Sequence, residues 1–379
     1  MYTYERLGVP RVVNASGKMT RLGGSVLAPD VLRAMTAAGG AYVDLDELKV
    51  LAGAAIAAWT GAEAAWVTSG AAAGIAVMTA AVVAGADPAR VARLPNGDWE
   101  PRSVLIQAGH WVDFGAPVEQ MVRLGGGRPV AVGATNLVTS ERLRAALTGE
   151  TAAILFVQSH HAVQHGMLAL DPVVEIARER GVPVLVDAAA EDDLGRYVAA
   201  GVDLVAYSGG KAFAGPTSGF VAGRAALVAA CRAQERGIAR AMKVGKEAVL
   251  GLLAALEAYV GRDEAAEHDR QRAIVSEILG ALGDLPHTRV AEAPDEVGRR
   301  IVRVALSPDA GALGFTATDL ARALADGIPR VMVRAHRAAA GTIALDPRPL
   351  AKADVSVLVD AIRAAYRRLG ARGSQLTIA

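Results

Sequence analysis

The stretch that decides the fold is Asp203-Leu-Val-Ala-Tyr-Ser-Gly-Gly-Lys-Ala-Phe-Ala-Gly-Pro-Thr-Ser-Gly219. It begins with an apolar run, which is typical of a strand buried on both faces of a parallel sheet. Ser208-Gly209-Gly210 ends that strand, and Lys211 follows in a mostly apolar loop that turns at Gly215-Pro216. Because α/β sheets bind ligands at the carboxyl ends of their strands, the stretch predicts an α/β sheet with a ligand site at Lys211.

Further apolar runs alternate with longer stretches of helical periodicity from about residue 60 onward. This alternation is typical of parallel sheets that carry helices on both faces. Asp171-Pro172 is expected to start a helix that runs to Arg180, with Asp as its cap and Pro in its first turn. The sequence therefore predicts a large, mostly parallel α/β domain, with further strands at Ala64–Val67, Ser103–Ile106, Thr151–Val157 and Pro183–Val186.

The pattern changes after residue 223. Residues 223–280 contain no proline and have apolar residues at helical spacing, which predicts a long helical connection. A small α+β domain is expected after it, with strands at Arg299–Leu306, Arg330–Arg334 and Thr342–Leu345 and helices at Ala317–Ala325 and Ala353–Leu369. We therefore expect an N-terminal arm over residues 1–45, a large domain over 46–255 and a small domain over 256–379.

Composition and charge exclude several classes of protein. The 379 residues carry 40 Lys and Arg against 39 Asp and Glu, so no net charge attracts the chain to nucleic acid or to an anionic membrane. The single cysteine, Cys231, excludes a disulfide scaffold and a multi-cysteine metal site and fits a reducing cytoplasm. The N-terminus lacks the apolar core of a signal peptide, so a cytoplasmic protein is expected.

Residues 64–86 carry no charge and are long enough to span a bilayer. Thr68-Ser69-Gly70 and Gly74 interrupt the run, and most of its other residues are alanine. A buried strand, a glycine turn and a helix of small residues are therefore expected instead of a membrane span.

Lys211 has the setting of a reactive amine. Burial of its amine would favour the neutral form, which attacks a carbonyl group and forms a Schiff base. Only 6 of the 40 basic residues are lysine, so this chain normally uses arginine where it needs charge. The alternative is a lysine that contacts phosphate or is solvated.

Asp187 places a carboxylate at the end of another apolar run, Val184-Leu-Val-Asp187, and is followed by Ala188-Ala189. A buried carboxylate needs a partner. A pyridine nitrogen that must stay protonated is one such partner, and small residues would let a flat ring approach. The alternative is an aspartate that caps the following turn.

The segment Trp66-Val-Thr-Ser-Gly-Ala71 predicts a strand, a tight turn and a helix start. Free backbone N–H groups and the positive end of the helix dipole would bind an anion such as phosphate at Ser69, Gly70 and Ala71. The segment has neither the P-loop spacing nor the GxGxxG spacing of dinucleotide sites.

These three segments, in this order, resemble the phosphate loop, pyridine aspartate and Schiff-base lysine of fold-type I pyridoxal-phosphate enzymes. The resemblance is narrower still, to the family of bacterial selenocysteine synthase and D-glucosaminate-6-phosphate ammonia-lyase-like proteins. It covers nearly the whole chain and rests on Asn14-Ala-Ser-Gly17, Gly23-Gly24, Ser159-His160-His161, Val186-Asp-Ala-Ala-Ala-Glu191, Gly209-Gly-Lys211 with Gly215-Pro216, and Leu345-Asp-Pro-Arg348.

The resemblance implies pyridoxal 5'-phosphate as cofactor and a homodimer or higher even homo-oligomer, because such enzymes complete each site with a second subunit. It implies that Lys211 forms the Schiff base and removes the α-proton, and that Asp187 keeps the ring nitrogen protonated. The other cofactor-binding residues that it implies are Ser69, Gly70, Ala71, His110, Ala189 and Ser208, with His110 stacking on the ring.

The sequence departs from selenocysteine synthase in two respects. The catalytic motif begins at Asn14, without the extra N-terminal domain that binds tRNA, and Thr217-Ser218-Gly219 stands where Gln usually follows the glycine-proline turn. Together with the net charge of +1, this favours a small-molecule substrate and the ammonia-lyase-like branch.

His160, His161 and His165 suggest a metal site only superficially, since adjacent side chains on an extended chain point in opposite directions. No metal is expected, and His160 or His161 is expected to contact the cofactor or substrate. A substrate carboxylate suits the planar guanidinium of Arg334, at the end of a predicted strand, and Asn14 is expected on the substrate side as well. His336, Arg337 and Arg348 are alternatives to Arg334.

The predicted function is a lyase that converts a β-hydroxy or β-substituted amino acid or amino-sugar acid into a 2-keto acid and ammonia. His160 or His161 would protonate the departing hydroxyl group. Racemisation and transamination start from the same proton removal, so a racemase or aminotransferase stays open. So does a non-catalytic or phosphosugar-binding protein on the same scaffold, in which Lys211 only neutralises phosphate.

Overall fold

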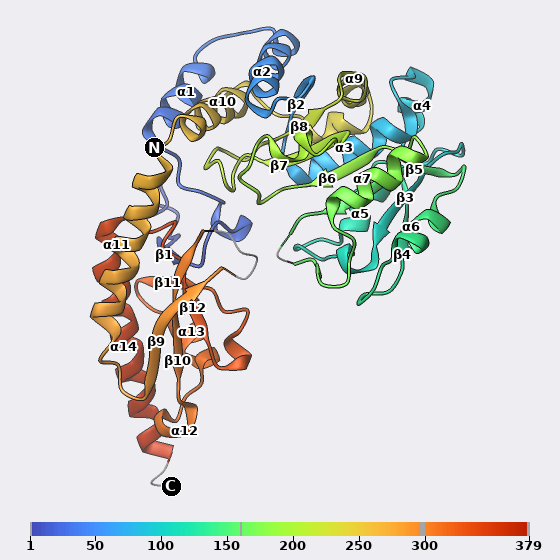
Figure 1. The fold of residues 1–379 in the computed structure, drawn as a ribbon. Helices are drawn as coiled ribbons and strands as arrows, with labels where there is room; N and C mark the ends of the chain where they lie inside the picture. The colour runs from blue at the N-terminus through green and yellow to red at the C-terminus, as the bar shows by residue number, and fades with distance from the viewer. Residues whose placement is uncertain (1, 160, 296–299, 377–379) are drawn as a thin grey trace. The chain divides into compact units, whose positions relative to one another are not determined.

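The computed structural model describes residues 2–159, 161–295 and 300–376 and divides the chain into two compact units (Figure 1). The larger unit comprises residues 23–261. The smaller unit comprises residues 1–22 together with residues 262–379.

A seven-stranded sheet forms the centre of the larger unit, in the order β2-β8-β7-β6-β5-β3-β4. β8 is antiparallel to β7 and β2, and the remaining neighbours are parallel. This confirms the predicted fold class. The strands are β2 (Ala64–Thr68), β3 (Ser103–Gln107), β4 (Arg128–Val132), β5 (Thr151–Val157), β6 (Val184–Asp187), β7 (Leu204–Ser208) and β8 (Gly219–Gly223).

Helices cover both faces of this sheet, because alternate residues of each buried strand point to opposite sides. Val205 and Tyr207 pack in a core with α2, α6, α7 and α10, whereas Leu204 and Ala206 pack in a core with α3, α5 and α9. The helices of this unit are α1 (Pro29–Gly39), α2 (Leu45–Thr60), α3 (Ala71–Ala84), α4 (Pro88–Arg93), α5 (Val118–Leu124), α6 (Ser140–Ala146), α7 (Leu170–Glu179), α8 (Arg196–Ala199), α9 (Ala225–Ala233) and α10 (Lys246–Val260), with 3-10 turns η2 (Ala108–His110), η3 (Gln234–Arg236) and η4 (Ile238–Met242).

The uncharged run at 64–86 forms β2, a glycine turn and α3, as predicted. A side chain at Gly74 would place its Cβ 2.9 Å from the Cβ of Ala206, so the small residues of α3 let the helix lie directly on β7. Within the described part of the chain, no helix is long and apolar enough to cross a membrane.

The smaller unit joins the first strand of the chain to its C-terminal part. β1 (Val12–Ala15) pairs in parallel with β11 (Arg330–Val333), and β9 (Thr288–Pro294), β10 (Val302–Pro308) and β12 (Ile343–Leu345) form an antiparallel sheet. Helices cover it and share one apolar core with it. The helical elements are α11 (Glu264–Leu282), α12 (Ala310–Leu313), α13 (Ala317–Ala325) and α14 (Lys352–Leu376), with 3-10 turns η1 (Thr20–Leu22) and η5 (Ala338–Ala340).

Two local predictions differ from the structure. α7 begins at Leu170 with Ala169 at its N-cap, so Asp171 lies in the first turn and is not the cap. There its charge still faces the positive end of the helix dipole. The predicted helical connection over 223–280 is a series of helices, with breaks at Gly237, Gly245 and Gly261, each of which stands at a helix end.

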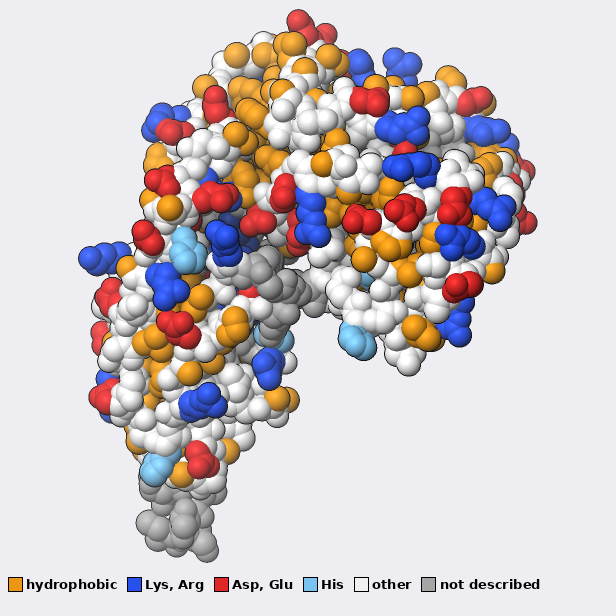
Figure 2. All heavy atoms as spheres, in the orientation of Figure 1, with side chains coloured by type: hydrophobic (Ala, Val, Ile, Leu, Met, Phe, Trp, Pro, Cys, Tyr) orange, Lys and Arg blue, Asp and Glu red, His pale blue; other side chains and the backbone are white. Residues whose placement is uncertain are grey.

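Acidic and basic side chains are interspersed on the face of the molecule shown in Figure 2. This distribution agrees with the net charge of +1.

Candidate active site

Three strands of the larger unit end near one another at one edge of the sheet. Ser208, the last residue of β7, pairs with Gly219 of β8, and Gly219 pairs with Thr68, the last residue of β2. Asp187 ends the neighbouring parallel strand β6, where it pairs with Ala206. The structure therefore brings the segments with Ser69, Asp187 and Lys211 to one edge of one sheet.

Asp187 is buried, Lys211 is half-buried, and the two side chains are electrostatically coupled. Burial raises the pKa of the Asp187 carboxyl, while the Ala189 N–H, which donates to its Oδ1 at 3.0 Å, and the Lys211 charge oppose that rise. Burial lowers the pKa of the Lys211 amine, and the Asp187 charge opposes that fall. A lowered pKa of the Lys211 amine is the direction that its predicted role requires, and that role stays a prediction.

The turn between β2 and α3 has the form of an anion cradle. Gly70 is the N-cap of α3 and makes no side-chain cap, so the helix begins with backbone N–H groups only. The Thr68 hydroxyl donates to the Gly70 carbonyl at 3.0 Å and fixes the turn. A Cβ on Gly219 would lie 2.8 Å from the Gly70 carbonyl carbon, so the absence of a side chain there lets β8 and the turn meet.

A segment that sequence reasoning did not assign to the site packs on the Lys211 loop. The Ser25 hydroxyl donates to the Gly210 carbonyl at 3.1 Å. Gly24, at φ +82°, lies so close that a Cβ there would stand 2.8 Å from the Gly210 oxygen. The Gly23-Gly24 pair of the family resemblance was the available signal, but nothing in the sequence placed Ser25 beside Lys211.

His110 is fully buried at the end of η2. Its Nδ1 accepts the Val157 N–H at 3.3 Å, its Nε2 lies 3.3 Å from Gln164 Oε1, and its ring meets Phe156 edge-on at 4.6 Å. Burial lowers its pKa to about 4, and the hydrogen bond with Gln164 opposes this fall. His110 is thus a neutral imidazole beside the end of β5, and its stacking on a cofactor ring stays a prediction.

The other predicted histidines follow β5. His160 lies outside the described residues. His161 is exposed, and its N–H donates to the Ser159 hydroxyl at 3.2 Å. Among the described residues, no group of three or more His, Cys, Asp or Glu side chains could hold a metal ion.

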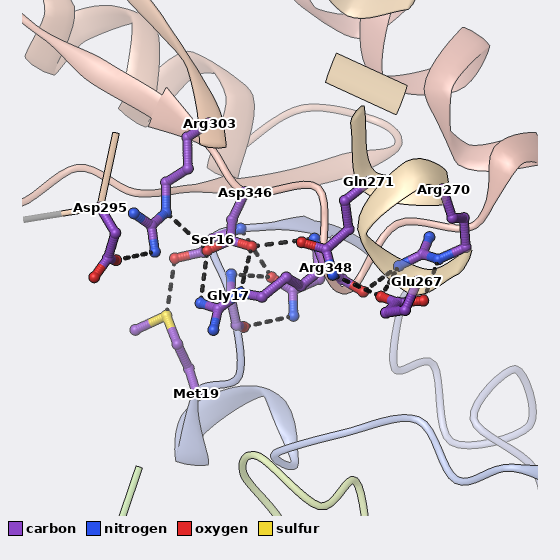
Figure 3. Close-up of polar contacts among 11 residues, drawn as sticks. Ser16, Gly17, Met19, Glu267, Arg270, Gln271, Asp295, Arg303, Asp346 and Arg348 are labelled. Carbon is purple, nitrogen blue, oxygen red and sulfur yellow. Dashed lines mark hydrogen bonds and ion pairs between the residues drawn. The ribbon is translucent and has the colours of Figure 1, made fainter. Parts of the chain in front are cut away.

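Asn14, a predicted substrate-side residue, lies in the smaller unit and organises a turn. Its Oδ1 accepts the Ser16 N–H at 3.0 Å, and its Nδ2 donates to the Gly17 carbonyl at 2.9 Å. Figure 3 shows this turn against Asp346, which accepts from both Arg303 and Arg348. Burial would raise the Asp346 pKa, but these guanidinium groups outweigh it and lower the pKa.

Arg334 follows β11 in the same unit and lines a cavity of about 270 Å³, which Arg303, His336 and Arg337 also line. Arg303 forms an ion pair with Asp295 at 2.8 Å. Asp295 also lines the cavity, and Arg303 pairs with Asp346 as well, so Arg334 and Arg337 are the lining arginines suited to a substrate anion. The predicted competitor Arg348 is held by Asp346, so its guanidinium already has a carboxylate partner.

Lys18 is a second amine with a lowered pKa. Burial, and then the charge of Arg348, lower its pKa to about 8. It belongs to the smaller unit, as Asn14 and Arg334 do. The predicted cofactor residues Ser69, Gly70, Ala71, His110, Asp187, Ala189, Ser208 and Lys211 all belong to the larger unit.

The edge of the larger sheet fits pyridoxal phosphate. That group carries an aldehyde, a ring nitrogen and a phosphate. Lys211 offers an amine of lowered pKa for the aldehyde, Asp187 offers a buried carboxylate for the nitrogen, and the α3 N-terminus offers N–H groups for the phosphate.

Comparison with known proteins decides the family. Residues 12–282 match the family SelA, described as L-seryl-tRNA selenium transferase. The chain belongs to this family.

This SelA-family chain is 44% identical over 363 residues to D-glucosaminate-6-phosphate ammonia lyase of Salmonella typhimurium (strain 14028s / SGSC 2262), across 95% of this chain and 96% of the relative. It is 45% identical over 349 residues to 5'-C-glycyluridine monooxygenase-decarboxylase of a Streptomyces species, across 92% of this chain and 88% of the relative. The predicted resemblance is confirmed.

Solved structures agree with the family assignment. The structure of D-glucosaminate-6-phosphate ammonia-lyase superposes with a TM-score of 0.90 at 41% identity, across 97% of this chain and 99% of that one. Serine palmitoyltransferase from Sphingomonas wittichii has a TM-score of 0.57 at 17% identity, across 96% and 89%. The second likeness shows the shared fold alone.

Proposed function

We propose that this SelA-family protein is a pyridoxal-phosphate-dependent ammonia lyase. Its substrate is a β-hydroxy or β-substituted amino acid, and we favour an amino-sugar acid of the kind named for the Salmonella relative. The products are a 2-keto acid and ammonia. The observation that carries the proposal is the likeness to that ammonia lyase over the whole chain, at 44% identity and a TM-score of 0.90.

Bound pyridoxal phosphate supplies an electron sink that stabilises negative charge at the substrate α-carbon. Lys211 would hold the cofactor through its amine and would take the α-proton of the substrate, and burial acts in favour of its neutral form. Asp187 keeps the ring nitrogen protonated through its negative charge. The α3 N-terminus with Ser69, Gly70 and Ala71, together with Ser208, binds the phosphate.

Two kinds of side chain would act on the substrate, a histidine and an arginine. His161, or His160 beside it, would donate a proton to the departing β-hydroxyl, since a histidine titrates near neutral pH. Arg334 would bind the substrate carboxylate through its two-pronged donor, supported by the cavity that it lines together with Arg337.

A second candidate function follows from the Streptomyces relative, whose identity of 45% is no lower than that of the lyase. In that case the chain would carry out an oxidative decarboxylation, with consumption of O₂ and release of CO₂. The lyase alignment reaches 96% of its relative and this one reaches 88%, so we favour the lyase.

One screen separates these functions. Amino acids and amino-sugar acids, with and without a phosphate, are incubated with the holoenzyme, and ammonia, 2-keto acid, CO₂ and O₂ uptake are measured. A lyase releases ammonia and keto acid in equal amounts without O₂ uptake or an added amino acceptor. Product formation only with a keto-acid acceptor would make it an aminotransferase, inversion at the α-carbon alone a racemase, and CO₂ with O₂ uptake a monooxygenase-decarboxylase.

We also propose that the protein is a homodimer, or a higher even oligomer, in the cytoplasm. Large apolar side chains are exposed between residues 26 and 51 of the larger unit, among them Val26, Tyr42 and Leu51. Exposed apolar groups of this kind are typical of subunit interfaces. Mass measurement in solution tests this, and a stable, active monomer would refute it.

A further inference from the structure

Aromatic side chains are scarce in this chain, yet several gather beside the Lys211 loop. The sequence has seven Tyr and five Phe. Five of these residues form one group in the larger unit, which we call the aromatic cluster: Tyr197, Tyr207, Phe213, Phe220 and Tyr259. Five of the twelve Tyr and Phe residues thus lie in one connected group.

Ring contacts join the members of the aromatic cluster. Tyr207 stacks on Phe220 with their centroids 5.0 Å apart, and Phe213 meets Tyr259 edge-on at 4.9 Å. Tyr207 and Phe213 are 5.8 Å apart. Edge-on and stacked geometries of this kind are favourable beyond the area that they bury.

The aromatic cluster holds the segment that follows Asp187. The Tyr207 hydroxyl donates to the Asp193 carbonyl at 2.7 Å, and the Tyr259 hydroxyl donates to the Asp192 carbonyl at 2.6 Å. Tyr197 adds a longer contact to Glu191 at 3.4 Å. Hydroxyl groups from β7, α8 and α10 thus fasten residues 191–193, which lie a few residues beyond Asp187.

The aromatic cluster also holds the loop that carries Lys211. Phe213 is part of that loop and is only 3% exposed, and Tyr207 directly precedes Ser208. Backbone hydrogen bonds close the loop on itself, from Gly215 N–H to Gly209 O at 2.8 Å and from Ala214 N–H to Lys211 O at 3.2 Å. Phe213 is therefore an anchor through which a closed loop is attached to the core.

We propose that the aromatic cluster couples two segments, with Tyr259 and Phe213 as positioning residues. The first is residues 191–193, which follow Asp187, and the second is the loop of residues 209–215, which carries Lys211. The Tyr259 hydroxyl donates to Asp192 in the first segment, and its ring packs on Phe213 in the second. Loss of either contact should therefore increase the mobility of both segments. The consequence for catalysis rests on the proposed function, in which Asp187 and Lys211 act on the same cofactor. An error of about 1 Å in such a constellation costs up to about 100-fold in rate.

The test uses the holoenzyme with Tyr259→Phe, which removes only the hydroxyl, and Phe213→Leu, which removes the ring. The smaller unit offers matched controls. Phe315 and Tyr366 meet edge-on at 5.2 Å, and the Tyr366 hydroxyl lies 3.0 Å from that of Thr288. Tyr366→Phe and Phe315→Leu therefore delete the same groups from an equivalent pair outside the proposed active site.

Amide hydrogen exchange of residues 190–194 and 209–215 is measured together with kcat and KM. Tyr259→Phe should raise exchange about tenfold in both segments and lower kcat about tenfold, while KM changes by less than about twofold. Phe213→Leu should do the same, and the controls should do neither. Faster exchange in residues 190–194 alone, an unchanged kcat, or an equal loss of kcat in the controls would overturn the proposal.

The exchange measurement does not depend on which reaction the enzyme catalyses. If wild-type protein shows no lyase activity but Tyr259→Phe still loosens both segments, the proposed function fails and the coupling stands. If the wild type is an active lyase and only residues 190–194 loosen, the coupling fails and the function stands.

Discussion

Asp187 and Lys211 stand at the carboxyl edge of one sheet, after neighbouring strands, and each shifts the pKa of the other. Burial raises the pKa of Asp187 and lowers that of Lys211, and their mutual attraction opposes both shifts. This is the balance that a cofactor lysine needs, because the amine must be neutral to react while a carboxylate stays available for a ring nitrogen.

Lys211→Ala should abolish turnover, because no amine remains to release the substrate or to remove the α-proton. Cofactor should still bind through the α3 N-terminus and Asp187, which equilibrium dialysis with pyridoxal phosphate measures. Lys352→Ala, an exposed lysine of the smaller unit, is the control and should keep full activity. Near-normal turnover by Lys211→Ala would disprove the assignment, and Lys18 would be the next lysine to test.

Asp187→Asn should lower kcat by at least about 100-fold, because the charge that keeps the ring nitrogen protonated is lost. A second readout needs no cofactor. The Asp187 charge raises the pKa of Lys211, so in cofactor-free protein the variant's Lys211 should react with an amine reagent from a lower pH than in the wild type. Full activity together with an unchanged reactivity profile would count against the pairing.

Sequence alone predicted the sheet and the strand ends that carry Ser69, Asp187 and Lys211, because both depend on local patterns. Apolar runs that end at Ser208 and Asp187 mark buried strands, and a strand followed by Ser69-Gly70 marks a helix start. It did not predict the antiparallel strand β8, which lies between β7 and β2 in the sheet, and the pairing of β8 with β2 joins positions far apart in the chain. The contact of Ser25 with Gly210 depends on the same kind of long-range packing.

The sequence did not predict the pairings within the smaller unit either. β1 pairs with β11, and the Asn14 turn docks on Asp346, more than 300 residues away in sequence. Neither strand carries a pattern that identifies its partner. The aromatic cluster was missed for the same reason, because Tyr259 and Asp192 meet only in the folded chain.

Gly219→Ala should weaken cofactor binding. Its Cβ would lie 2.5 Å from the Tyr207 oxygen and 2.8 Å from the Gly70 carbonyl carbon, and backbone atoms can yield only by moving the Gly70 turn. We expect the dissociation constant of pyridoxal phosphate to rise at least about tenfold, since the amide cradle is displaced. Gly149→Ala, with nothing within 4 Å of the new Cβ, is the control. Equal affinities of the two variants would argue against this cradle.

His110 should make the larger unit sensitive to acid. Its folded-state pKa of about 4 lies below the ordinary value of 6.5, so the unfolded chain binds a proton that the native state does not. The stabilisation is complete above pH 6.5 and is lost as the pH falls towards 4, by about 3 kcal/mol in unfolding free energy.

Urea titrations followed by tryptophan fluorescence measure this loss, because all four tryptophans, at 59, 66, 99 and 111, lie in the larger unit. The loss should be absent from His110→Gln, so the two stability curves should converge as the pH falls. Curves that stay parallel from pH 7 to pH 4 would show that His110 is not the titrating group.

The central claim is that Lys211 carries the cofactor, and reduction with borohydride followed by peptide mass spectrometry tests it most directly. A reduced cofactor on Lys211 blocks trypsin there, so a single peptide spanning residues 197–224 should appear with the added mass of pyridoxyl phosphate. Cleavage after an unmodified Lys211, with the added mass on another lysine or on none, would contradict the account.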